Sequence, residues 1–372
     1  MKFMISRDDL YRIASRLRGI PARASSMPVL THVHLMTKRG ELFITATDLE
    51  VLVRVTTETE VFDEGSIAIP ADPFFKIIRK MPDENISFET GANNRIKVSG
   101  GNARFNLAGL AGEDFPQFPE LDMKETLSIP SNTLQSMLEK TLFAVSRNEG
   151  MARLCGVFAV IRGNNGSNTF CMVGTDGHRL AKMETPAYQT VTVLQDGILI
   201  PLKGGIELLR MAREADGNVE LRIDKNNLSS SLPGETLIIR LLNGQFPDYR
   251  AVTDNTGGVP VLTDRESLIE CLERIHVMAR DQTSHVSLSL KETDVMEMKT
   301  FNHDLGDAED RVPVRTDLKE ISVGFNAGYL LEGLKVMKSR NLDILLKDAR
   351  SPAFIKGEED EGFTYVVMPM RA

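Results

Sequence analysis

The chain contains three similar segments in succession, and this internal repeat limits its possible folds more than any other feature. The segments "MKFMISRDDLYRIASRL", "TLSIPSNTLQSMLEKTL" and "VPVLTDRESLIECLERI" each place a short alternating run before polar residues and an amphipathic stripe. Leu10, Leu134 and Leu268 are equivalent, and mostly apolar or small residues follow each of them at helical spacing. Each repeat is therefore expected to begin with a strand, a capped turn and a helix that buries one face.

A second set of similar segments follows in each repeat. The stretches "SIAIPADPFFKIIRKM", "GILIPLKGGIELLRMA" and "EISVGFNAGYLLEGLKVM" each indicate a strand, a break and another helix, and further alternating strands come after them. Amphipathic helices need an apolar surface to cover, and the strands supply one. The sequence thus predicts an α+β fold of three repeated domains, each with two helices packed on antiparallel sheets. The predicted limits are 1–121, 127–250 and 258–372.

Cysteine usage and hydropathy indicate a cytoplasmic protein. Cys155, Cys171 and Cys271 are scattered among apolar residues without a pairing pattern, which favours a reducing compartment. The sequence has no apolar run near the roughly 18–20 residues that span a bilayer, and its start lacks the pattern of a secretory leader. We therefore expect no membrane association.

The distribution of charge is more informative than its sum. A net charge of −8 disfavours a protein that binds DNA through bulk charge. Nevertheless, Arg16, Lys140 and Arg274 recur six positions after the equivalent leucines, on the helix side away from the apolar stripe. This recurrence predicts a surface that contacts phosphates without reading bases. The alternative is that these residues belong to ordinary solvated helix faces.

The stretch "GTDGHRLA" (174–181) combines an aspartate, a histidine and an arginine, as many active sites do. The chain has no G-x-S-x-G elbow, phosphate-binding loop or dinucleotide motif, and its other histidines show no metal-ligand spacing with His178. A tight turn is predicted instead, in which Asp176 bonds its own backbone and Gly177 adopts a positive φ. We predict no catalytic residue, metal or cofactor. An acid–base or metal-dependent hydrolase using Asp176 and His178 remains the alternative.

This stretch and two others identify a family resemblance. "TDGHRLA" (175–181), "FPDYR" (246–250) and "YVVMPMR" (365–371) resemble the bacterial DNA sliding clamps, the beta subunits of DNA polymerase III, and the resemblance covers the whole chain. It implies three clamp domains per chain and a head-to-tail homodimer that closes into a ring around duplex DNA. Such a ring is a non-catalytic processivity factor that holds DNA topologically. A toroidal structural protein that does not bind DNA is the alternative.

The resemblance also implies which residues meet DNA and which meet the second copy. Helices line the hole of the ring in this family. The residues expected to face DNA are Arg12, Arg16, Arg23, Arg79, Lys140, Arg147, Lys203, Arg210, Arg274 and Lys335. At the dimer interface, Arg104 and Phe105 are expected to meet Val277 and Met278 of the other chain, and acidic residues at 304–310 are expected to pair with basic ones.

A groove for partner peptides is the last implication. The partners would be the polymerase III catalytic subunit, the clamp loader, other polymerases and repair proteins, each inserting a short hydrophobic motif. His178 and Arg179 would supply the polar edges of the groove. The expected groove residues are Leu154, Thr175, Gly177, His178, Arg179, Leu180, Pro247, Val252, Asn326, Tyr329, Val366, Met368, Pro369, Met370 and Arg371. Four positions depart from the family pattern, namely Ala251, Thr283, Arg350 and Pro352.

Overall fold

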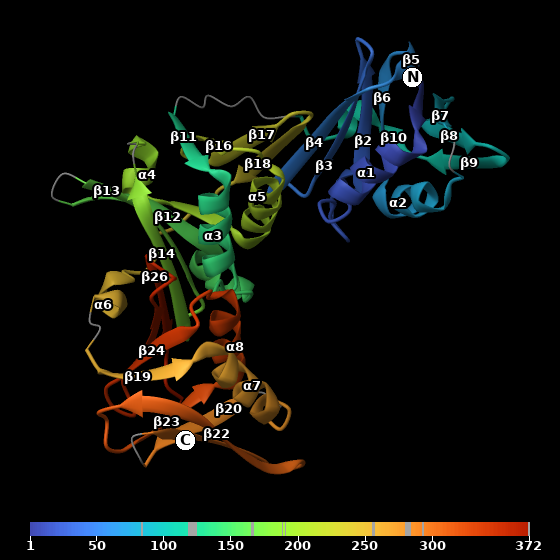
Figure 1. Ribbon diagram of the computed structural model, residues 1–372. Helices are drawn as coiled ribbons and strands as arrows, with labels where there is room; N and C mark the ends of the chain where they lie inside the picture. The colour runs from blue at the N-terminus through green and yellow to red at the C-terminus, as the bar shows by residue number, and fades with distance from the viewer. Residues whose placement is uncertain are drawn as a thin grey trace. The chain divides into compact units, whose positions relative to one another are not determined.

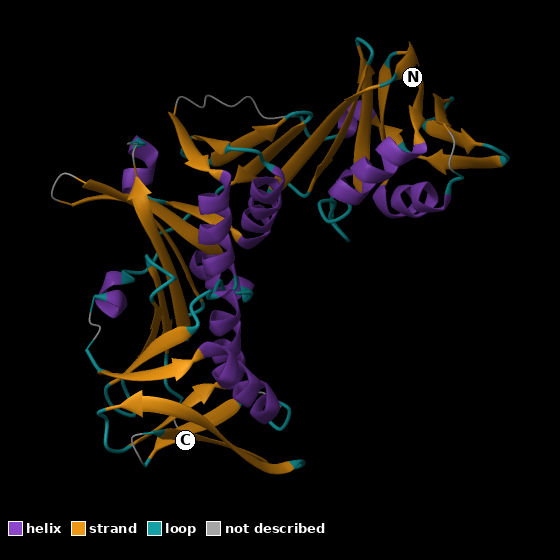
Figure 2. Ribbon diagram, viewed as in Figure 1, coloured by secondary structure: helices purple, strands orange, loops and turns teal. Residues whose placement is uncertain are grey.

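The computed structural model in Figure 1 describes residues 1–82, 85–117, 125–164, 167–187, 189, 191–254, 257–279, 284–291 and 294–370. Figure 2 shows helices packed against layers of strands, and the strand pairs are antiparallel. The predicted α+β class is therefore confirmed.

The chain divides into two compact units. One comprises Met1–Pro130 and Arg210–Leu241, and the other comprises Ser131–Leu209 and Leu242–Ala372. The second repeat is shared between the units because its strands join the sheets of both neighbouring repeats.

The first repeat supplies twelve strands and helices to the first unit. They are β1 (Lys2–Ser6), α1 (Arg7–Leu17), β2 (His32–Lys38), β3 (Glu41–Thr47), β4 (Val51–Glu58), β5 (Glu60–Asp63), β6 (Gly65–Pro70), α2 (Ala71–Lys80), β7 (Asn85–Thr90), β8 (Arg95–Gly100), β9 (Ala103–Ala108) and β10 (Leu110–Ala111).

The second and third repeats follow the same order. The second contains β11 (Glu125–Pro130), α3 (Ser131–Leu142), β12 (Gly156–Asn164), β13 (Ser167–Thr175), β14 (Arg179–Ala187), α4 (Thr192–Asp196), β15 (Ile198–Pro201), α5 (Leu202–Glu214), β16 (Asn218–Ile223), β17 (Asn227–Leu232) and β18 (Glu235–Arg240). After α6 (Arg250–Thr253), the third contains β19 (Val259–Asp264), α7 (Arg265–His276), β20 (His285–Leu290), β21 (Val295–Asn302), β22 (Gly306–Thr316), β23 (Ile321–Asn326), α8 (Ala327–Val336), β24 (Asn341–Leu346), β25 (Ala353–Gly357) and β26 (Phe363–Val367).

The first helix of each repeat forms as its sequence predicts. The equivalent Leu10, Leu134 and Leu268 are all buried, which confirms the apolar stripe. Two of these helices begin at a side-chain cap: Ser6 Oγ accepts from the Asp9 amide at 3.1 Å, and Asp264 Oδ1 accepts from the Ser267 amide at 2.9 Å. Such caps satisfy amides that have no partner within the helix.

The repeats are joined strand to strand. In the first unit, β4 pairs with β18, with Val53 opposite Leu237. In the second unit, β14 pairs with β26, with Ala181 opposite Tyr365. Each pairing places the last strand of one repeat beside the fourth strand of the repeat before it.

Several strand edges remain open among the described residues, and those of β9 and β22 belong to the strand types found at the junctions. Strand β9 pairs only with β8, and β22 pairs with β21 and, over its last residues, with β19. Strand β9 is the first repeat's equivalent of β18 and β26, and β22 is the third repeat's equivalent of β4 and β14. These two open edges thus belong to the same two strand types that form the closed junctions.

Candidate binding surfaces

The junction between β14 and β26 brings distant predicted site residues together. Leu180 lies opposite Val366 in the pairing register, and the Met368 amide donates to the His178 carbonyl at 2.8 Å. The Met370 amide donates to the Gly324 carbonyl at 2.8 Å, so backbone bonds hold the stretch after β26 at both ends. The pairing therefore places "TDGHRLA" beside the "VVMPM" segment.

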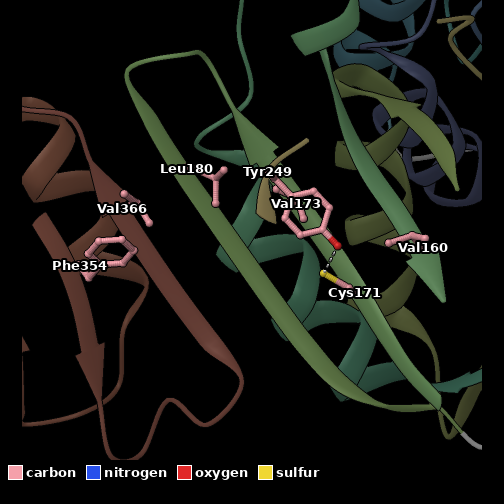
Figure 3. Close-up of a cluster of buried hydrophobic side chains, with 7 residues drawn as sticks. All are labelled: Val160, Cys171, Val173, Leu180, Tyr249, Phe354 and Val366. Atoms are coloured by element: carbon pink, nitrogen blue, oxygen red, sulfur yellow. Dashed lines mark hydrogen bonds between the residues drawn. The ribbon is translucent and has the colours of Figure 1, made fainter. Parts of the chain in front are cut away.

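A buried apolar cluster lies beneath this junction. Figure 3 shows Leu180 and Val173 from the second repeat beside Val366 and Phe354 from the third. Tyr249 packs on the same cluster and its hydroxyl reaches Cys171 Sγ at 3.8 Å. The "FPDYR" segment is thereby fixed to the sheet, and Phe246 of this segment also stacks on Phe158 at 4.9 Å. Half-buried Val252 of α6 packs against the same cluster.

Exposed side chains sit around this buried floor. Met368 is 40% exposed, and His178 is exposed with its ring 6.4 Å from that of Tyr329. We call His178, Val252, Tyr329 and Met368, together with the Leu180–Val366 pair below them, the junction surface. It offers an adaptable apolar contact with one imidazole beside it.

The turn before β14 has the predicted structure. Asp176 Oδ1 accepts from the amides of His178 at 2.9 Å and Arg179 at 3.0 Å, and Gly177 has a φ of 88°. The Thr175 hydroxyl, which is buried, donates to the Arg179 carbonyl at 2.6 Å. The carboxylate is committed to this turn, which argues against an acid–base role for Asp176 with His178.

The same turn occurs in the other two repeats. Asp48 Oδ1 accepts from the amides of Glu50 at 3.0 Å and Val51 at 2.8 Å. Asn302 Oδ1 accepts from the amides of Asp304 at 2.9 Å and Leu305 at 3.1 Å. The turn is therefore a structural element of every repeat, and an exposed histidine occurs both in the second copy, as His178, and in the third, as His303.

Arg179 does not form a polar edge, so that expectation is wrong. Only 7% of its side chain is exposed, and its guanidinium bonds Asp176 at 3.1 Å, Glu332 at 2.7 Å and the Phe143 carbonyl at 2.8 Å. Its Cζ also lies 4.4 Å from the Tyr329 ring centroid. Side chains alternate along a strand, so Arg179 points inward and holds α8 against the turn.

The remaining predicted groove residues have varied surroundings. Leu154 ends a 3-10 helix, Glu149–Leu154, and is half-buried, while Pro247 is exposed within "FPDYR". Asn326 caps α8 by accepting from the Tyr329 amide at 3.0 Å. Pro369 and Met370 are half-buried. Arg371 and Thr283 lie outside the described residues. The other positions that depart from the family pattern are Ala251 and Arg350, both exposed, and half-buried Pro352.

Two of the residues expected to face DNA instead form ion pairs with the next repeat, one of them buried and the other partly buried. Lys140 is 4% exposed and its ammonium lies 2.7 Å from Asp360 in the turn between β25 and β26. The Arg16 side chain is 9% exposed, and its Nε lies 2.9 Å from each carboxylate oxygen of Glu235, at the turn between β17 and β18. In both cases the hairpin turn of the next repeat covers the helix side that periodicity assigned to solvent.

The equivalent residue in the third repeat has a different environment. Arg274 pairs with Asp310 of its own repeat at 2.7 Å, and 59% of its side chain is exposed. On the neighbouring helix, Lys335 is 53% exposed and pairs with Glu273 at 2.6 Å. The other basic residues vary in exposure: Lys203 is half-buried, and the exposed ones are Arg12, Arg23, Arg79, Arg147 and Arg210.

The residues predicted for the dimer interface lie on open parts of the chain. Phe105 on β9 is 36% exposed, and Arg104 beside it is exposed. Val277 and Met278 follow α7, and Val277 is 54% exposed.

Across the described ranges, no group of three or more His, Cys, Asp or Glu side chains is arranged to hold a metal ion. Cys155, Cys171 and Cys271 are free thiols. None of the helices in the described part of the chain is long and apolar enough to cross a membrane.

Comparisons with known proteins agree on one family. The profiles of the DNA polymerase III beta subunit match in order: the N-terminal domain over 1–119, the central domain over 128–248 and the C-terminal domain over 258–371. The beta sliding clamp of Haemophilus influenzae is 32% identical over 372 residues and is covered fully, as is this chain. A sliding clamp from Bartonella birtlesii, solved bound to griselimycin, has a TM-score of 0.93 at 26% identity, with 100% of both chains covered. One from Pseudomonas aeruginosa has a TM-score of 0.89 at 29% identity, again with full coverage of both.

Proposed function

Since this chain belongs to the DNA polymerase III beta-subunit family and is a non-catalytic sliding clamp that keeps the polymerase processive, we propose that it acts as a cytoplasmic, head-to-tail homodimer around duplex DNA. The domain limits 1–121, 127–250 and 258–372 are part of this proposal. The observation that carries it is the pair of open edges, because β9 and β22 are the two strand types that already join the repeats within the chain.

The closed junctions define a register for the dimer. Leu237 pairs with Val53, and Tyr365 pairs with Ala181. The turns at Asp48, Asp176 and Asn302 align the three repeats, with one additional residue in the third. In this alignment, the equivalent of these two pairs is Phe105 with the partner subunit's Ala308. Arg104 then lies opposite the partner's Glu309, which supplies charge complementarity across the interface.

The ends of the first helices support the same contact. Arg16 on α1 and Lys140 on α3 each reach the hairpin turn of the next repeat. By equivalence, the end of α7, with Val277 and Met278 beyond it, faces the turn between β8 and β9 of the second copy. An apolar patch flanked by charge is typical of a modest protein interface.

We further propose that partner peptides bind the junction surface. Polymerases, the clamp loader and repair proteins would each insert a short hydrophobic segment against Val252 and Met368, with His178 at the edge. The support is that segments far apart in sequence converge there on a rigid apolar floor. Apolar clefts with a few placed polar groups are the common form of peptide and ligand sites.

Truncation tests the peptide proposal. Removing residues 368–372 deletes Met368 but leaves the Leu180–Val366 pairing and the β9 edge intact. We expect loss of binding to a short hydrophobic peptide from a clamp-binding partner, with a folded dimer retained. Phe105→Asp is the matched control, because it should abolish the dimer and leave the peptide affinity of each chain unchanged. Undiminished affinity in the folded truncated dimer would overturn the assignment.

For DNA, we propose loose contacts from the exposed helix charges and retention by topology. The residues that keep this role are Arg12, Arg23, Arg79, Arg147, Lys203, Arg210, Arg274 and Lys335. Exposed contacts are individually weak and screened by salt, which suits a ring that slides. A clamp loaded on circular plasmid should dissociate when the plasmid is cut once. A protein that stays bound to the linear product with free ends does not act by encircling DNA.

A further inference from the structure

A basic hollow in the first unit lies between α1, α2 and the segment that joins α1 to β2. Its volume is about 860 Å³, and its charged lining includes Arg18, Arg23, Lys76 and Arg79 with Asp72 as the acidic member. Helices α1 and α2 lie side by side in Figure 1, so one helix supplies each wall. A site this large accommodates a ligand of one or two nucleotides.

Most of the positive charge at this hollow has no carboxylate beside it. Among the described residues, the ion pair at the hollow is that of Lys76 with Asp72 at 2.7 Å. Arg18, Arg23 and Arg79 are exposed, and no described carboxylate lies within ion-pair distance of them. In a chain with a net charge of −8, three uncompensated guanidinium groups around one hollow mark a site for an anion.

Part of this charge is found only at the helix pair of the first repeat. Ser15, Arg18 and Lys76 of the first repeat correspond by position to Glu139, Leu142 and Glu207 in the second and to Glu273, His276 and Glu332 in the third. Arg79 differs from them, because its equivalents Arg210 and Lys335 are also basic. A general requirement for loose contacts with duplex DNA would apply to all three helix pairs. The difference between them indicates a ligand that is specific to the first pair.

Aromatic rings complete the lining. Phe75, which is half-buried, and Tyr11, which is 40% exposed, both line the hollow. Arg7 covers one face of the Tyr11 ring at 5.0 Å, which leaves Phe75 as the ring better placed for a ligand. Guanidinium groups beside an aromatic ring are the combination that binds single-stranded nucleic acid, where bases are free to stack.

We propose that this hollow binds a short stretch of single-stranded DNA, with phosphates at Arg18, Arg23 and Arg79 and a base against Phe75. Duplex DNA presents only its phosphates to such a site, because its bases remain stacked inside the helix. The site would hold an unpaired strand, such as one beside a primer end, in addition to the topological hold on duplex. It belongs to one chain and does not depend on the ring.

Binding of a short oligothymidine that contains one 2-aminopurine tests this proposal on the intact protein. The chain has no Trp, so the probe's fluorescence is read without protein background. Replacing Arg18 and Arg79 together with Ala should weaken binding about tenfold and reduce the dependence of log affinity on log salt by about 1.4, at about 0.7 per phosphate contact. The matched control is Lys38→Ala with Lys225→Ala, which removes two exposed charges from the same unit.

Two further comparisons complete the test. Phe75→Leu keeps the apolar bulk and should remove the quenching of 2-aminopurine while phosphate contacts persist. Blunt duplex at equal nucleotide concentration should compete poorly with the single strand. The proposal is overturned if the Arg18 and Arg79 replacements do no more than their control, if quenching survives in Phe75→Leu, or if duplex competes as well as single strand. Plasmid retention reports separately on the clamp function.

Discussion

The closed junctions and the open edges of this chain are built from the same parts but differ in what they bury. At each closed junction, a strand pairs with the next repeat, and a basic residue on the first helix forms a buried or partly buried ion pair with an acid at the next hairpin turn. At the open end, Arg274 is more than half exposed and pairs within its own repeat. Basic residues at equivalent positions of the repeats therefore have different roles, because their burial depends on whether the neighbouring strand edge is paired.

The largest expected effect comes from Phe105→Asp on the open edge. A carboxylate placed opposite the partner's Ala308 and next to its acidic strand would be buried without a cation, which opposes association. We expect monomers by light scattering, with unfolding of each chain little changed because Phe105 lies on an open edge within the chain. A Phe105→Asp protein that remains dimeric would show that β9 is not at the interface.

Breaking a closed junction should cost stability within the chain instead. Lys140→Met leaves the buried Asp360 without its cation, although Ser339 and the Lys338 amide still donate to that carboxylate. We expect a loss of about 3 kcal/mol in the free energy of unfolding. Arg16→Met should act similarly through Glu235, and denaturant titration measures both. A loss below about 1 kcal/mol would mean that these pairs do not hold the junctions.

The equivalent change at the open end should be small. The Arg274–Asp310 pair is solvent-exposed, and such pairs contribute about 0–1 kcal/mol. We therefore expect Arg274→Met to leave the unfolding free energy of a monomeric Phe105→Asp background nearly unchanged. The comparison between Lys140→Met and Arg274→Met isolates the effect of burial, since both remove one cation at an equivalent position. Equal losses would contradict the account.

The smallest effect concerns pH. Burial alone would raise the pKa of Asp360, but hydrogen bonds from Lys140, Ser339 and Lys338 outweigh it and hold the pKa below its ordinary value. A carboxyl with a lowered folded pKa stabilises the protein above its unfolded pKa, and this contribution is lost as pH falls through the folded pKa. The stability difference between the protein and Asp360→Asn should therefore shrink below about pH 4. A stability difference that grows on acidification would contradict a lowered pKa for Asp360.

Helical periodicity predicted the buried leucines, and the turn-forming chemistry of Asp and Gly predicted the Asp176 turn, since both features are local. Periodicity failed for Arg16 and Lys140, because the side of the helix opposite its stripe is covered by a hairpin from the next repeat, which no helical pattern reveals. The sequence signal that could have predicted these ion pairs is the acidic residue at equivalent hairpin turns, Glu235 in the second repeat and Asp360 in the third. The prediction for Arg179 was wrong for a related reason. The family resemblance had assigned its side chain to a groove edge, whereas the alternation of side chains along the strand points it inward. The convergence at the junction surface came from the family resemblance alone.

A disulfide cross-link tests the head-to-tail register most directly. In a chain carrying both Arg104→Cys and Glu309→Cys, each interface of the proposed dimer places one new thiol opposite the other. Mild oxidation should give one covalent species with the mass of two chains, while either single variant gives none. Covalent chains of increasing length, or no cross-linking in a folded dimer, would contradict the closed head-to-tail ring.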